Sequence, residues 1–176
     1  MRSRAALLPV VLCALLVAAC GGAKEPVHYQ ADWQVFEATD TLFEEATLVV
    51  EATPTGPGVS EELHIGGEPD ETSVYTVSEV KITRVLKGSA SEGDRIKVKQ
   101  LGGEVDGVEF IEDETVYLAA EKPYLLFLET YPDAPASLLN PKQAQYPKNA
   151  AGDFVSLPGN ELTMTKAELA RLAPGK

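Results

Sequence analysis

Short runs of alternating apolar and polar residues fill the centre of the chain, approximately residues 47–129. The first run, at 47–53, is rich in β-branched residues, and glycine, aspartate or proline separates the later ones. Strand-length runs at a spacing of about 8 to 12 residues, with no amphipathic helix between them, are typical of all-β domains. The pattern therefore predicts a mainly β fold, either a small antiparallel barrel or a sandwich. The later runs are "RIKVKQL", "GVEFIE", "TVYLAA" and "PYLLFLE".

One predicted strand, "SVYTVSEVKITRVLKG", changes its alternation along its length. Tyr75 and Val77 share one face, Val80 and Ile82 share the other, and Val85 returns to the first. Because successive side chains of a strand point to opposite faces, this change of phase indicates a β-bulge or a bend. We expect the strand to curl around a barrel or to pass from one sheet to another.

Two short helices are expected to flank the β region. Thr41 and Glu44 have the spacing of a capping box just before the first strand. The segment "TKAELARLAPG" predicts a closing helix that is capped by Thr165 and anchored by Leu169 and Leu172. The chain thus predicts one β domain with a short N-terminal helix and a short C-terminal helix.

The segment between the last predicted strand and the closing helix is rich in proline. Four prolines lie in "TYPDAPASLLNPKQAQYPKNAAGD". Proline lacks the N–H group that a central strand or a helix interior needs. We therefore expect an ordered excursion over the β domain, followed by a terminal hairpin in "DFVSLPGNELTM" that turns at Pro158 and Gly159.

The first 19 residues follow a different pattern, in which Arg2 and Arg4 precede an uncharged apolar segment. A helix that spans a bilayer needs roughly 20 apolar residues, whereas a charged start, a shorter apolar core and a small-residue exit are typical of an export signal. Gly21 and Gly22 argue against the alternative of an N-terminal core helix. The expected organisation is a signal peptide at 1–19, a tether at 20–38 and a β domain at 39–173.

The end of this signal carries a recognisable motif. Val17, Ala18, Ala19 and Cys20 resemble the lipobox of bacterial prolipoproteins, over residues 1–22 only. The resemblance implies cleavage between Ala19 and Cys20, with diacylglycerol on the cysteine sulfur and fatty acyl chains such as palmitate. Two lipid signals suffice for lasting attachment, so the expected location is the extracytoplasmic face of the cell membrane. Ordinary secretion with a free Cys20 is the alternative.

The order of elements carries a second resemblance, over residues 40–130. A short helix, a bent strand, the "VLKG" turn, another strand, a glycine pair and the "YLLFL" strand are similar to the OB-like barrels of netrin-like and metalloproteinase-inhibitor domains. The cysteines that staple those domains are absent here. The resemblance therefore implies a fold and transfers no functional residue.

Charge and cysteine content narrow the partners and cofactors. Removing Arg2 and Arg4 with the signal changes the formal net charge from −12 to −14. A chain this acidic is repelled by phosphates, so we expect no nucleic-acid partner. Cys13 leaves with the signal and Cys20 is acylated, so neither a disulfide nor a cysteine metal site is expected. No other cofactor is predicted.

The sequence offers little that would support catalysis or metal binding. His28 and His64 fall in the expected tether and in a loop, with no serine or cysteine nucleophile in an elbow nearby. Ser78 and Lys81 form an S-x-x-K pair, but a strand points them to opposite faces. The acidic runs 68–71 and 112–114 lack the alternating ligands and central glycine of a calcium loop. We therefore expect a protein that is not an enzyme.

The remaining hypothesis is a binding surface after the last long strand. Aromatic residues gather there, and the segment 141–149 carries two lysines and no acid. Tyrosines beside lysines supply rigid contact area and hydrogen-bond donors, so an envelope protein or a wall polymer would meet least repulsion here. The expected function is an interaction module of the cell envelope, and the alternative is an accessory subunit of a transport or wall-synthesis complex. The candidate binding residues are Tyr131, Lys142, Tyr146 and Lys148.

Overall fold

The computed structural model describes residues 24–64 and 72–175. The signal peptide, the lipobox with Ala19 and Cys20, and the whole of the acidic run 68–71 lie outside the described residues. The strands are β1 (Val27–Tyr29), β2 (Leu48–Pro54), β3 (Val59–His64), β4 (Thr72–Lys87), β5 (Arg95–Leu101), β6 (Gly103–Val105), β7 (Val108–Glu112), β8 (Tyr124–Glu129), β9 (Ala136–Leu138) and β10 (Gln145–Pro147). The helices are α1 (Thr39–Glu45) and α2 (Lys166–Leu172).

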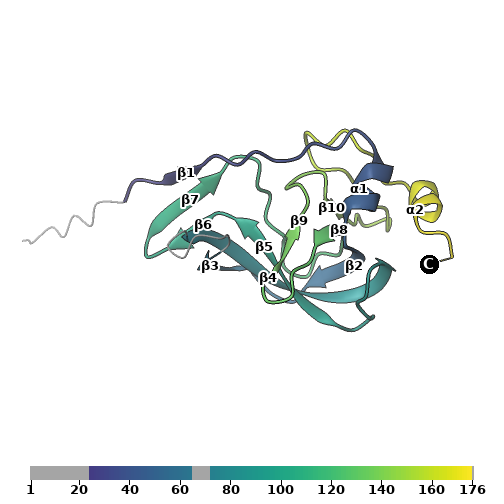
Figure 1. Cartoon of the computed structure of the whole chain (residues 1–176), viewed down its shortest axis with the longest axis horizontal. Helices are drawn as coiled ribbons and strands as arrows, with labels where there is room; N and C mark the ends of the chain where they lie inside the picture. Colours follow the sequence, from purple (N-terminus) through teal and green to yellow (C-terminus); the bar gives the residue numbers. More distant parts are fainter. Residues whose placement is uncertain (1–23, 65–71, 176) are drawn as a thin grey trace, which may run out of the picture.

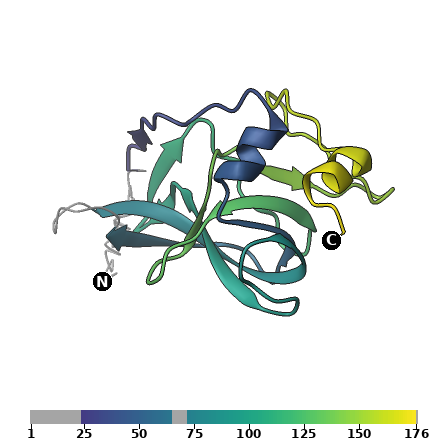
Figure 2. The same cartoon turned by 45° about the vertical axis from the view of Figure 1, so that its right-hand side comes forward.

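Five strands form a closed barrel (Figures 1 and 2), in the order β8, β2, β4, β5 and β9. The closing pairs are β5 with β9, which is parallel, and β9 with β8, which is antiparallel. β10 extends the sheet beside β8, and β3 pairs with β4. The prediction of a mainly β fold is confirmed, and the closure identifies it as a small OB-like barrel and not a sandwich.

The long strand β4 is bulged, as its sequence predicted, at the second of its two changes of alternation. Val50 of β2 faces Val85 of β4, whereas Ala52 faces Ile82, so β4 carries an extra residue between these two pairs. A second shift follows beside Val49. An extra residue bends a strand and increases its twist. The first bulge therefore lies between Ile82 and Val85, where the alternation returns to its first face, whereas the pairing with β5 is regular from Val77 to Val80.

The barrel interior and the two helices share one hydrophobic core. Val49, Val50, Ile82 and Leu126 are fully buried, and Leu42 of α1 joins the same cluster. Burying one such side chain stabilises the fold by about 1.5–3 kcal/mol. With no described disulfide, this core is the main source of stability.

A second sheet of three strands, β1, β7 and β6, leaves the barrel at a pair of glycines. Gly102 and Gly103 have φ values of +97° and +143°. A Cβ on Gly103 would come within 2.3 Å of Ser60 Oγ, and one on Gly102 within 2.7 Å of the Phe110 carbonyl oxygen. Only glycine accommodates both the backbone angle and this close approach.

The two helices lie together at the end of the molecule opposite the small sheet (Figures 1 and 2). The expected cap of α2 is confirmed, because the Thr165 side chain accepts a hydrogen bond from the Glu168 N–H. The capping box expected at Thr41 is wrong, because α1 begins two residues earlier and has no side-chain cap. The hydroxyl of Thr39 instead donates to the Glu168 carboxylate of α2, which ties the two helices together.

Three further expectations are corrected. "TVYLAA" forms no strand, because the side chain of Gln100 takes up the backbone groups of Val116 and Leu118. The proline-rich excursion contains the short strands β9 and β10, and β9 closes the barrel. The terminal hairpin is absent from the described residues, where an isolated bridge joins Lys148 to Phe154.

Candidate functional site

Two lysines on one face of β5 differ in exposure, and the buried one belongs to the candidate site. Val98 lies in the core, so Lys97 and Lys99 point to the opposite face of the strand. Lys97 is exposed, as expected for this face, whereas Lys99 is only 5% exposed. Residues after β8 cover Lys99, including Pro135, whose carbonyl oxygen accepts a hydrogen bond from Lys99 Nζ at 3.3 Å. The residues after β8 therefore cover Lys99 but leave Lys97 exposed.

Aromatic rings surround the buried ammonium. Lys99 Nζ lies 4.3 Å from the centroid of the Tyr131 ring and 5.9 Å from that of Tyr75. Both distances are within the range of cation–π attraction. The Tyr131 hydroxyl in turn donates to Glu129 at 2.8 Å. The site thus contains one cation from β5, two aromatic rings from β4 and from the loop after β8, and one carboxylate from the end of β8.

Burial shifts the pKa values of Lys99 and Tyr131. Desolvation lowers the pKa of Lys99 below 10.5, and the charge of Glu129 opposes that shift. Desolvation also raises the pKa of Tyr131 above 10.0. The lysine therefore loses its proton at a lower pH than an exposed lysine.

Lys99 forms part of the wall of a cavity of about 220 Å³, which we call the lysine cavity. The cavity lies outside the barrel, between β4, β5, β9 and the segment that precedes α1. Leu101, Leu138 and Pro141 add apolar surface. The side chains that give it chemical character are Trp33, Tyr75, Lys99, Thr115, Tyr131 and Ser137.

Glu112 at the end of β7 holds two of these wall residues in place. Its carboxylate accepts a hydrogen bond from Trp33 Nε1 at 3.1 Å and another from Thr115 Oγ1 at 2.7 Å. Glu112 is itself buried. A buried carboxylate with two donors is well compensated, so Glu112 positions the Trp33 side of the cavity without being free to bind a ligand.

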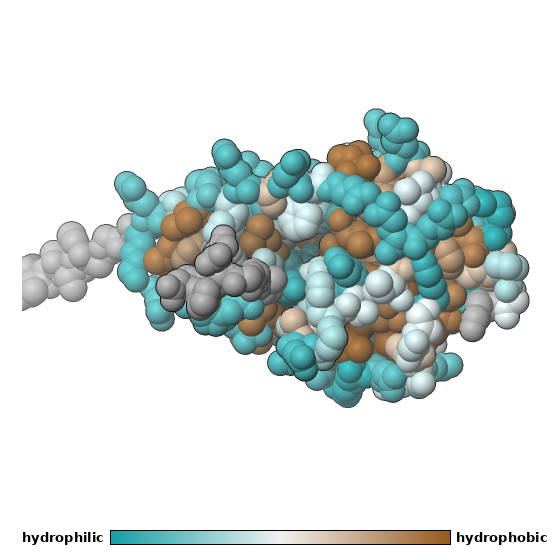
Figure 3. Space-filling model, viewed as in Figure 1, coloured by the Kyte–Doolittle hydropathy of each residue, from teal (hydrophilic) through white to brown (hydrophobic). Residues whose placement is uncertain are grey.

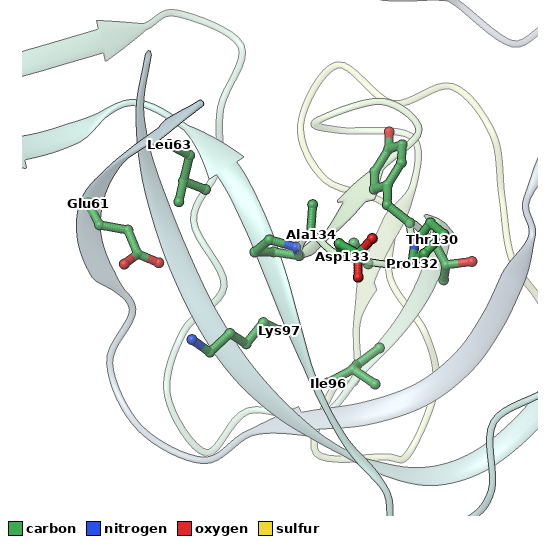
Figure 4. Close-up of a pocket in the computed structure, with 11 residues that line it drawn as sticks. Glu61, Leu63, Ile96, Lys97, Thr130, Pro132, Asp133 and Ala134 are labelled. Carbon is green, nitrogen blue, oxygen red and sulfur yellow. The ribbon is translucent and has the colours of Figure 1, made fainter. Parts of the chain in front are cut away.

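A wider groove lies beside the cavity, and Tyr131 lines both. This loop groove is formed by Glu61 and Leu63 of β3, Ile96 and Lys97 of β5, and residues 130–136. Figure 4 shows Lys97 between Glu61 and the loop that carries Thr130 and Asp133. The groove is more open than the lysine cavity and its lysine is exposed. It therefore provides surface for contact but less enclosure for a small ligand.

In the view of Figure 3, the apolar surface does not indicate another candidate site. On that face, apolar residues form several separate groups among polar ones. The most exposed large apolar residues, Val35 and Val59, belong to different parts of the fold, the segment before α1 and β3. We therefore place the candidate site in the lysine cavity.

Of the four predicted binding residues, the structure brings Tyr131 to this site. Tyr146 is fully buried in β10 and packs edge-to-face on Phe127, so its place in an exposed contact surface is wrong. Alternation alone could not show this, because β10 is hidden in a proline-rich segment.

The two predicted lysines are half-buried and paired with acids. Lys142 contacts Glu114, and Lys148 lies 3.1 Å from Glu51, which also binds Arg84. Lys148 Nζ also stands over the Phe154 ring at 5.0 Å from its centroid. The charge of the segment 141–149 is therefore largely compensated by neighbouring carboxylates, and the four predicted residues do not form one surface.

The other candidate residues lie apart from the cavity. His28 and His64 are exposed on β1 and β3, and Ser78 is buried while Lys81 is exposed. Within residues 24–64 and 72–175, no group of three His, Cys, Asp or Glu side chains is arranged to hold a metal ion. The helices of the same segments include none that is long and apolar enough to cross a bilayer.

Sequence reasoning missed the residues that define the cavity, Trp33, Tyr75 and Lys99. Alternation in "RIKVKQL" puts Lys99 on the face opposite Val98, and nothing local indicates that a distant loop covers it. A lysine between Val98 and Gln100, with aromatic residues elsewhere, is too common a pattern to be a signal. Comparisons with protein-family models, with curated proteins and with solved structures find no match for this chain.

Proposed function

We propose that this protein is a membrane-anchored, extracytoplasmic binding module that holds a small ligand in the lysine cavity and performs no chemistry on it. One observation carries the binding role: a buried ammonium with a single long hydrogen bond forms the wall of a cavity with aromatic sides. Burying a charge is costly unless it is paired and hydrogen-bonded. A ligand in the cavity would supply the missing partners.

The enclosure of the site supports binding over catalysis. Wall residues come from β4, β5 and β9 of the barrel, which are rigid elements, and Trp33 is fixed by Glu112. Preorganised walls of this kind reduce the entropy cost of binding. The two histidines, which are the residues able to act as bases near neutral pH, do not line the cavity.

The anchor is supported by the lipobox resemblance at residues 17–20. Full-length protein with Cys20 is expected in the detergent phase of a membrane extract, with lipid mass on its first residue. Cys20→Ala is expected to abolish the lipid mass and either release the protein or leave the precursor uncleaved. Wild-type protein recovered without lipid from the medium would contradict the anchor.

The binding role is tested with the intrinsic fluorescence of Trp33, the one tryptophan in the chain. Small molecules extracted from the host envelope are added to the wild type and to Ser137→Phe, which fills the cavity. We expect a saturable change in Trp33 emission in the wild type and none in the filled variant. An equal response in both, or no response in either, would overturn the binding role of this cavity.

A further inference from the structure

We infer that the lysine cavity is selective for a small, singly charged carboxylate with one ring, aromatic or sugar, whose carboxylate pairs with Lys99 and whose ring packs against Tyr131, Tyr75 and Trp33. This inference rests on the proposed binding function and adds the chemical class of the ligand.

The charge of the site favours an anion. An ammonium has three N–H donors, and the Pro135 carbonyl is the one hydrogen-bond acceptor found for Lys99 among residues 24–64 and 72–175. That contact is at the long end of the usual range. A carboxylate would accept from the remaining donors at about 2.7–2.9 Å. A neutral ligand would leave the buried charge as poorly paired as it is without a ligand.

The charge also limits the anion to one negative unit. Lys99 is the only cation among the described residues that line the cavity, and the negative charge of Glu129 acts on the same ammonium. A phosphate monoester carries close to two charges at neutral pH, and recognition sites for it use several arginines or lysines. A monocarboxylate matches one lysine beside one acid.

The size and walls of the cavity specify the rest of the ligand. A volume of about 220 Å³ is smaller than the roughly 300–1,000 Å³ of pockets for drug-sized ligands, which indicates a molecule of about one ring. Three aromatic side chains and Leu101, Leu138 and Pro141 offer apolar contact to that ring. The hydroxyl groups of Ser137 and Thr115 line the same space. Both an aromatic acid and a sugar acid have this combination of features.

Two matched pairs of probes separate charge from shape. Benzoate and benzamide share an aromatic ring, and glucuronate and glucose share a sugar ring, but only the first member of each pair is charged. Each is titrated at pH 7 into the mature protein while Trp33 emission is recorded. We expect the acid of at least one pair to bind about tenfold or more tightly than its neutral partner, the value of one charged hydrogen bond.

Variants assign this preference to Lys99. Lys99→Met is expected to remove the advantage of the acid while the ring still binds. Lys81→Met is the matched control, because it removes one exposed lysine from the same barrel and lines neither the cavity nor the loop groove. The preference should persist in this control. A preference that survives Lys99→Met would overturn the assignment.

A pH titration of the wild type provides a second measurement that needs no variant. The titratable groups around the ammonium are Glu129 of β8, Tyr131 after it and Tyr75 of β4. Burial lowers the pKa of Lys99, so this ammonium loses its proton at a lower pH than an exposed lysine. Affinity for the acid should fall as the pH rises towards 10.5, while affinity for the neutral partner should not. Acid affinity that is flat over this range would contradict the inference.

The outcomes distinguish the ligand class from the binding function. If benzamide or glucose binds as well as its acid, the inference about the carboxylate is wrong and the cavity remains a binding site. If no probe binds while the envelope extract still changes Trp33 emission in the wild type alone, the carboxylate class is again wrong. If neither probes nor extract produce a response, both the inference and the proposed function fail.

Discussion

Two polar clusters that both include residues of the segment 136–145 differ in how completely their groups are paired. The first, which we call the amide clamp, consists of Gln100, Asn140, Gln143 and Gln145. The Gln143 side chain accepts from the Phe36 N–H at 2.8 Å and donates to the Phe36 carbonyl at 2.9 Å. Gln100 makes the same two-sided pairing with residues 116 and 118.

The second cluster is the lysine cavity, where the cation has one hydrogen bond and two ring contacts among the described residues. Lys99 and the four amides are buried, and both clusters join the barrel to segments distant in sequence. Fully paired polar groups fix one structure, whereas under-paired groups beside an open volume are the usual setting of a binding site. The amide clamp therefore has a structural role. Because its polar groups are almost all paired, the shortage of hydrogen-bond partners at Lys99 is a distinctive feature of the cavity.

The largest effect is expected in the apolar core, outside both clusters. Tyr146→Ala removes a fully buried ring that packs on Phe127 of β8. Loss of such a side chain costs about 3–5 kcal/mol of unfolding free energy, which chemical denaturation would measure. Lys148→Met, two residues away and half-buried, is the control and should cost much less. Equal effects in both variants would contradict the assignment of Tyr146 to the core.

The next effect breaks the amide clamp alone. Gln143→Leu leaves the N–H and the carbonyl of buried Phe36 without partners, at about 1–3 kcal/mol for each group. We expect a loss of about 2–4 kcal/mol in the free energy of unfolding. Gln34→Leu, at an exposed amide in the same segment, should change stability little. A stable Gln143→Leu would mean that water replaces the amide and that the clamp is dispensable.

Lys99→Met is expected to change the free energy of unfolding in the opposite direction to Gln143→Leu. Removing a buried, poorly paired charge should leave stability unchanged or raise it by about 1 kcal/mol. Since folding lowers the pKa of Lys99, the cost of its charge is present in full at pH 7 and disappears above the unfolded value of 10.5. The difference between the variant and the wild type should therefore vanish at high pH. A clear loss of stability at pH 7 would show that Lys99 is structural.

The smallest effect concerns charges outside both clusters. Arg171 binds Asp40 of α1 through two hydrogen bonds of 2.8 and 2.7 Å and also binds Glu168. Hydrogen bonds from Arg171 lower the pKa of both acids, below 3.8 and 4.5 respectively. Their contribution is therefore present above these values and is lost as the pH falls through the lowered ones. Because these groups are exposed, the contribution is small.

Thermal melting from pH 7 to pH 2 tests this expectation with Arg171→Gln. The variant should melt slightly below the wild type at pH 7, and the two should converge in acid. Added salt should reduce the difference at pH 7, because exposed charges are screened. A difference that remains at pH 2 would contradict an ionic origin.

The sequence predicted the strands that carry their own pattern and missed those that depend on distant partners. "RIKVKQL" and "PYLLFLE" correspond to β5 and β8, because alternation or a continuous apolar run is a local property. β9 is only three residues long and follows Pro135, so it has no local pattern. Its identity as a strand comes from the edges of β5 and β8 that it joins.

The candidate site was predictable only in part for the same reason. Tyr131 was accessible to sequence reasoning, because it follows the last long strand directly and aromatic residues cluster there. Lys99 was not, since its burial depends on Pro135 and Tyr131 folding back over β5. Trp33 joins the cavity through Glu112, 79 residues later in the chain. Contacts at such separations leave no periodicity to detect.

The attachment of β1 to β7 would limit how far the barrel can stand from a lipid on Cys20. Val27 to Tyr29 pair with the edge of β7, and Lys24 Nζ donates to the Asp106 carbonyl oxygen at 2.7 Å. If Cys20 carries the lipid, four peptide units separate it from Lys24 and reach at most about 14 Å. The link between the lipid and the barrel would then be only a few residues long, and not the whole of the expected tether 20–38. Such a short link would hold the small sheet towards the lipid and keep both helices on the distal side. A ligand would then approach the barrel from the side.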